Sequence, residues 1–321
     1  MTPQEQIDNI VKTIQARVDS FNEAVPDVEK RLYNKLLQML KELKIVNGRV
    51  VNGVENIDKI SKVIPEIEKI IVDAGYERRV ANFSQAFDEV AKLQNNYFSS
   101  LNVKFKPKKV LTKLLEVNKT WTINKLTNQG ISSDFAPAIQ QVLERAMVSG
   151  AEYSDLTEMV RSYVLSGEAG PGALARYSGQ VATDAINFFS ANYNETVTAD
   201  LGLKWRVYTG SLLETSREWC VHMVKKEYVH EAELNDVIFK EIDGVEIGSE
   251  ELPVNKKTGL PRGMMEGTNA DTIKSNRGGH RCGHQWIAVT ESMVPLNTRI
   301  ATYNKYGIKH KNGIADKQKS R

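Results

Sequence analysis

The cysteines and histidines of this chain are the residues best suited to chemistry, and they gather in one stretch. Both cysteines and four of the five histidines of the 321 residues fall between positions 220 and 284. The stretch contains Cys-x-His twice, as Cys220 with His222 and as Cys282 with His284. Two thiolates and two imidazoles are the ligand number and type of a closed tetrahedral zinc site. These four residues are therefore predicted metal ligands, with His230 and His280 as further candidates.

The spacing leaves three states open for this cluster: a structural zinc site, a disulfide between Cys220 and Cys282, or buried thiols beside ordinary hydrogen-bonded histidines. Residues i and i+2 of a strand share a face, so Cys282 and His284 can point at one metal ion. On a helix Cys220 and His222 would lie roughly 200° apart, and only a turn or a helix end would let both bind. The Cys-x2-Cys spacing of many zinc sites is not present.

The catalytic motifs that such residues could serve are missing from the sequence. His230 and Glu231 begin like His-Glu-x-x-His, but position 234 is Leu234, which argues against a metallopeptidase. A nucleophilic cysteine paired with a histidine has no sequence context that would activate the thiol. There is also no Gly-x-Ser-x-Gly motif. We therefore predict no catalytic residues in this cluster and no cofactor other than the zinc ion considered above.

The elements that must position the cluster form an α+β region in the C-terminal third. A helix is expected from about residue 173 to residue 200, ended by Gly202. Residues 204–208 alternate like a half-buried strand, Thr215 and Ser216 begin a short helix, and residues 282–289 read as a closing strand. The acidic stretch 227–251 is expected to be a solvated insertion.

The first hundred residues predict an antiparallel helical bundle. Apolar residues recur at intervals of three and four, which lines one face of a helix. Residues Asn47 and Gly48 predict a tight hairpin turn between the second and third helices. The four apolar stripes are Ile7, Val11, Ile14, Val18 and Phe21; Leu32, Leu36, Leu40 and Leu43; Ile57, Ile60, Ile64, Ile67 and Ile71; and Phe83, Phe87, Val90, Tyr97 and Leu101.

Three more helical segments follow, and Trp121 is expected to anchor the first of them, at residues 111–126. Glycines at 167, 170 and 172 around Pro171 indicate a hinge or linker. The fold class is thus mainly α with a smaller α+β C-terminal domain, in which a long helix leads into a small sheet. The predicted domains are a helical bundle (1–105), a helical linker region (106–170), an α+β domain (171–298) and a basic flexible tail (299–321).

Composition limits the partners. Apolar residues make up 41% and charged residues 26%, which is typical of a folded globular chain. No signal peptide and no membrane-spanning stretch is recognisable, so no membrane partner is expected. The last 23 residues carry seven Lys or Arg and one acid. They could neutralise DNA phosphates, or simply be a solubilising tail. The candidate DNA contacts are Lys305, Lys309, Lys311, Lys317, Lys319 and Arg321.

The order of motifs from residue 173 onward resembles the C-terminal domain of the Mu F-like phage head morphogenesis proteins. The resemblance begins in the helix around Arg176, Thr183 and Asp184 and continues through the strand carrying Trp205. Its most specific part is Thr-Ser-Arg-x-x-Cys at 215–220, followed by Gly-Gly-x-x-Cys-x-His-x-Trp at 278–286. It covers a little over a third of the chain, and the helical N-terminal part carries no matching motif.

The resemblance implies a minor head protein of a bacteriophage, and a protein that is not an enzyme. Such a protein would be a virion component inside the head near the portal, and would be in the host cytoplasm during assembly. It would contact portal or capsid proteins and serve head morphogenesis or DNA delivery. Two alternatives stay open: a toxin-like or nuclease enzyme that uses the Cys/His cluster, and a cellular helical scaffold protein.

Overall fold

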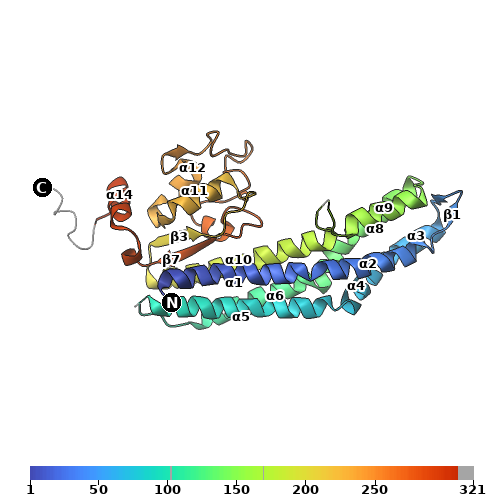
Figure 1. Cartoon of the computed structure of the whole chain (residues 1–321), viewed down its shortest axis with the longest axis horizontal. Helices are drawn as coiled ribbons and strands as arrows, with labels where there is room; N and C mark the ends of the chain where they lie inside the picture. The colour runs from blue at the N-terminus through green and yellow to red at the C-terminus, as the bar shows by residue number, and fades with distance from the viewer. Residues whose placement is uncertain (102, 169, 310–321) are drawn as a thin grey trace, which may run out of the picture. The chain divides into compact units, whose positions relative to one another are not determined.

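The computed structural model describes residues 1–101, 103–168 and 170–309 (Figure 1). Helices make up most of it, and a small sheet lies in the C-terminal part, which confirms the predicted fold class. The elements up to residue 100 are α1 (Pro3–Glu23), α2 (Val25–Leu40), the hairpin β1 (Ile45–Val46) and β2 (Arg49–Val50), α3 (Val54–Ser61), α4 (Val63–Asp73) and α5 (Tyr76–Ser100).

The middle of the chain is helical throughout and ends in the longest helix, α10. Its elements are α6 (Lys109–Leu126), α7 (Asn128–Gly130), a π-helical turn (Ile131–Phe135), α8 (Ala136–Val148), α9 (Tyr153–Val164) and α10 (Ala173–Leu201). The C-terminal elements are β3 (Trp205–Thr209), α11 (Glu218–Lys226), β4 (Tyr228–His230), α12 (Asp236–Phe239), β5 (Glu241–Ile242), β6 (Val245–Glu246), α13 (Ile273–Asn276), β7 (Gln285–Val289) and α14 (Leu296–Tyr306).

The chain packs into two compact units, and neither unit is one continuous stretch. One unit comprises residues 13–90 and 112–186; the other comprises residues 1–12, 91–111 and the chain from 187 onward. Helices α1, α5, α6 and α10 each contribute residues to both units. The predicted domain limits at residues 105, 170 and 298 stay predictions.

Among the residues that the structure describes, the regular elements of the first unit are helices, apart from the β1–β2 hairpin. Asn47 and Gly48 both have positive φ, as the predicted turn requires. The expectation for Trp121 is wrong, because half of its surface is exposed. The glycine-rich segment after α9 is held by the fully buried Glu29 of α2, which accepts hydrogen bonds from Ser166 and from the backbone N–H of Ala175.

The second unit contains a three-stranded antiparallel sheet in the order β4-β3-β7. Residues Trp205–Tyr208 of β3 are all buried, and so the expected half-buried alternation does not occur. Trp205 packs against Tyr303 of α14, whereas Tyr208 packs against Trp219 of α11. In Figure 1, α11 and α12 lie over the strands β3 and β7. Layers on both faces of the sheet thus bury the central strand.

Helix α14 occupies the beginning of the predicted basic tail. Its Tyr303 is buried, and the hydroxyl oxygen of this residue lies 3.3 Å from the indole Nε1 of Trp205. Residues 296–306 therefore belong to the folded unit. Over the part of the chain that the structure describes, none of the helices has the combined length and apolar character needed to cross a membrane.

Candidate metal centre

Two segments far apart in the sequence bring the site residues together. Cys220 lies in the first turn of α11, whereas Cys282 and His284 lie in the loop that leads into β7. The side chain of Arg217, just before α11, donates a 2.7 Å hydrogen bond to the backbone carbonyl of His280. This bond ties the start of α11 to the loop, so the two cysteines approach each other although 62 positions separate them.

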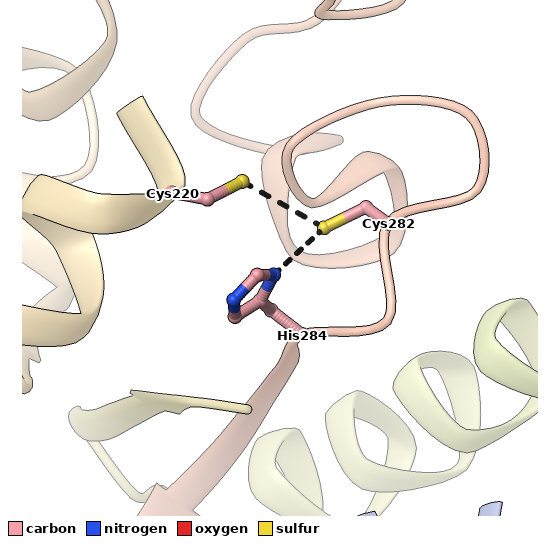
Figure 2. A group of neighbouring side chains, drawn as sticks. All are labelled: Cys220, Cys282 and His284. Carbon is pink, nitrogen blue, oxygen red and sulfur yellow. Dashed lines mark hydrogen bonds between the residues drawn. The ribbon is translucent and has the colours of Figure 1, made fainter. Parts of the chain in front are cut away.

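Three ligand atoms meet in the interior of this unit (Figure 2). The Sγ atoms of Cys220 and Cys282 lie 3.9 Å apart, and Nδ1 of His284 lies 3.5 Å from the Cys282 sulfur. All three ligand atoms lie within 4.8 Å of one another. The residues are 1%, 3% and 6% exposed, so the cluster is part of the core.

Tyr208 of β3 completes the polar surroundings of the sulfurs. Its hydroxyl lies 3.4 Å from the sulfur of Cys220 and 3.5 Å from that of Cys282. Its ring stacks on the imidazole of His284, with centroids 5.4 Å apart and planes 12° from parallel. The sequence analysis did not include Tyr208 among the site residues. Tyr208 lies in the strand that the sequence predicts at residues 204–208, but the sequence does not show that this strand passes beside the sulfurs.

The two glycines of the Gly-Gly motif have a steric reason in this site. A Cβ at Gly278 would lie 2.2 Å from the sulfur of Cys220 and 3.2 Å from that of Cys282. Gly279 has φ of +110°, a backbone conformation that other residues rarely adopt. The loop can approach the sulfurs this closely because Gly278 carries no side chain, whereas a Cβ at Gly279 would meet the backbone oxygen of Gly263 at 1.9 Å.

The hydrogen bond between the thiols makes their protonation unequal. It raises the pKa of Cys220, and burial adds to that rise. The same bond lowers the pKa of Cys282, and the contact with His284 lowers it further. Cys282, the sulfur between the other two ligand atoms, is therefore the more acidic of the two thiols.

The structure leaves His222 out of this group. Cys220 and His222 lie on the same helix, where residues two apart point in directions roughly 200° apart. The Nε2 atom of His222 lies instead 3.3 Å from a carboxylate oxygen of Glu251. His230 accepts a hydrogen bond from the backbone of Ala232 and caps a short 3₁₀ turn. Only Cys220, Cys282 and His284 of the predicted ligands are brought together.

The candidate DNA contacts fall into three groups. Lys305 of α14 pairs with Glu241 at 2.7 Å and approaches Asp236 at 4.0 Å, and so it is engaged within the unit. Lys309 is exposed. The other four predicted contacts, Lys311, Lys317, Lys319 and Arg321, lie outside the described residues.

The chemistry open to the cluster follows from its donors and its burial. Two sulfurs and one imidazole nitrogen form a donor set that suits zinc. A disulfide would require the sulfurs to come within about 2.05 Å, far closer than their 3.9 Å separation. A nucleophilic cysteine must reach a substrate, whereas both thiols here are buried. Comparison of the chain with protein-family models, with curated proteins and with solved structures finds no match.

Proposed function

We propose that this chain is a minor head protein of a bacteriophage, a virion component that acts in head morphogenesis or DNA delivery. One observation carries the proposal. The two segments with the most specific resemblance to Mu F-like head proteins, residues 214–220 and 276–286, pack against each other and share one buried cluster. Their residue types are therefore explained by a common structural role, as expected of a motif that defines a domain.

A structural role fits the environment of this cluster better than an enzymatic one does. Two tryptophans of the same segments, Trp219 and Trp286, are 2% and 1% exposed and lie in the same core. A catalytic centre must admit a substrate to its reactive group, whereas a domain core excludes solvent. The toxin-like or nuclease alternative therefore gains no support from the geometry of Cys220 and Cys282.

The partners that the proposal implies are portal or capsid proteins, with packaged DNA as a further partner of the basic C-terminus. Residues 310–321 contain four Lys or Arg and one acid, and phosphate neutralisation needs charge without a fixed fold. Because α14 packs on the sheet through Tyr303, a truncation that tests DNA binding should begin at residue 310. Removing residues from 299 onward would also remove part of the core.

The direct test is a quantitative mass-spectrometric count of the protein in purified, DNA-filled particles, scaled to the major capsid protein. We expect a few to a few tens of copies in each particle. A matched count in particles from a strain lacking the gene sets the background. Absence from both filled particles and assembly intermediates, together with normal heads in the deletion strain, would contradict the proposal.

Truncation supplies a separate test of the DNA contact. The logarithm of the binding constant of the full chain for duplex DNA should fall linearly with the logarithm of salt concentration. This dependence should become less steep when residues 310–321 are removed. The His222→Gln variant serves as a folded control that retains the tail. Equal slopes for the full and truncated chains would remove the tail from the set of DNA contacts without affecting the virion assignment.

A further inference from the structure

We propose that Cys220, Cys282 and His284 bind one zinc ion as its three protein ligands, with Tyr208 as the hydrogen-bonding partner of the sulfurs and without His222. This site is independent of the proposed virion function, since a metal ion could stabilise this fold in any setting. Its consequence is that the ion would join α11 to the loop before β7, two segments that are remote in sequence.

Two of the three distances between the ligand atoms match a tetrahedral zinc site, and the third is at most 4.8 Å. Zn–S bonds of about 2.3 Å and Zn–N bonds of about 2.0–2.1 Å place two sulfurs about 3.8 Å apart and a sulfur and a nitrogen about 3.5 Å apart at tetrahedral angles. The observed separations are 3.9 Å between the sulfurs and 3.5 Å between Cys282 Sγ and His284 Nδ1. Two edges of the tetrahedron are therefore already formed around Cys282.

The charge of such a site suits its buried position. Two thiolates buried together would repel each other. Both cysteines are buried, so water does not screen this repulsion. A zinc ion bound to two thiolates and a neutral imidazole gives a cluster with no net charge. A site of this composition can therefore lie in the core without leaving a net charge there.

The surrounding loop is built to hold the ligands in place. The buried side chain of Arg277 donates hydrogen bonds to the backbone carbonyls of Cys282 and Ser275. Gly278 leaves room for the sulfurs, and the hydroxyl of Tyr208 donates to the sulfur of Cys220. Hydrogen bonds of this kind orient metal ligands and typically change metal affinity about 10- to 100-fold when they are lost.

Metal content and cobalt substitution test the site directly on the full chain. Protein purified without chelator should contain one equivalent of zinc. After removal of zinc, titration with Co²⁺ should give thiolate-to-cobalt charge-transfer absorption and the intense visible bands of tetrahedral Co²⁺, saturating at one equivalent. Chelation should lower the midpoint of thermal unfolding of the wild-type chain, and added zinc should restore it.

Variants separate the ligands from their neighbours. Cys282→Ser and His284→Gln should lose stoichiometric binding, whereas His222→Gln, a change only two residues from Cys220, should bind one equivalent like the wild type. Tyr208→Phe should retain the cobalt bands with about 10- to 100-fold weaker affinity. Because a ligand variant could fail to fold, the wild-type chelation experiment gives an answer that does not depend on any substitution.

Several outcomes would overturn the site. One is substoichiometric zinc together with no cobalt bands and no effect of chelator on the unfolding midpoint. A second is an intact mass lower by two hydrogens, which would identify a disulfide. A third is loss of binding in His222→Gln, which would refute the ligand assignment. None of these results bears on the particle count, so failure of the metal site and failure of the virion proposal are distinguishable.

Discussion

Replacing Glu29 should loosen the beginning of α10, because this carboxylate caps the helix from a different part of the chain. Glu29 is fully buried on α2. One carboxylate oxygen accepts from the N–H of Ala175, in the first turn of α10, at 2.8 Å. The other accepts from the backbone N–H and the hydroxyl of Ser166 at 3.0 and 2.6 Å. The first N–H groups of a helix have no partner within the helix, so this carboxylate replaces a local cap.

The size of the effect follows from these three hydrogen bonds. A hydrogen bond to a charged group contributes about 1.5–3 kcal/mol, and a negative charge at a helix N-terminus adds about 0.3–1 kcal/mol. In Glu29→Gln the amide oxygen can still accept from Ala175 or from Ser166, but the NH₂ group then faces the hydrogen-bond donors of the other residue. We therefore expect a loss of about 2–3 kcal/mol. Glu29→Ala removes all three bonds and leaves buried N–H groups unpaired, for a loss of about 3–5 kcal/mol.

Denaturant unfolding followed by circular dichroism measures the loss, and hydrogen exchange locates it. Exchange should accelerate at Ala175 and in the rest of the first turn of α10. Glu116→Gln, the same change at an exposed position, is the matched control and should stay within about 0.5 kcal/mol of the wild type. If Glu29→Gln matched this control and exchange at Ala175 were unchanged, the capping role would be refuted.

Three further predictions concern the unit that contains the sheet. Trp286→Ala should lower the free energy of unfolding by about 3–5 kcal/mol, measured by denaturant unfolding followed by near-UV circular dichroism. Trp121 is half exposed, so Trp121→Ala should lower it little, and equal effects would contradict the placement of the core. Burial lowers the pKa of His230, so stability should be full above about pH 6.5 and decline as the pH falls below it, because the unfolded chain takes up the proton first. His230→Asn should reduce this decline in urea unfolding measured down to about pH 5; an unchanged slope would refute it. Arg206 binds Glu195 through two hydrogen bonds of 2.7 and 2.8 Å, so Arg206→Met should cost about 3–5 kcal/mol; a double-mutant cycle with Glu195→Met that showed no coupling would contradict this role.

The sequence was sufficient to identify the candidate site but not its full composition. Clustering predicted that Cys220, Cys282 and His284 act together, and the helical position of Cys220 already weighed against His222. Tyr208 could not be predicted, because its contact with both sulfurs depends on how β3 lies beside β7. A tyrosine in a strand has many available neighbours, and only the register of the sheet selects among them.

The spacing of apolar residues was sufficient to predict the helices, but not their long-range contacts. Apolar spacing reports which face of a helix is buried, and most stripe residues are indeed buried, as with Ile7, Leu36 and Phe87. Spacing does not report what covers that face. Trp121 shows the limit, since a large aromatic residue in a helical pattern is expected inside but lies half exposed.

The glycine-rich segment shows how a local pattern can suggest a hinge where the fold has an anchor. Residues 167–172 contain three glycines around Pro171, so the sequence predicts a hinge or linker. The partner that restrains them is Glu29, 137 residues before Ser166. A Cβ at Gly172 would lie 2.2 Å from the backbone oxygen of Val164 and 2.5 Å from a carboxylate oxygen of Glu29. The absence of side chains thus serves close approach here, as it does at Gly278 beside the cysteine sulfurs, and only the identity of the distant neighbour distinguishes such a position from a flexible joint.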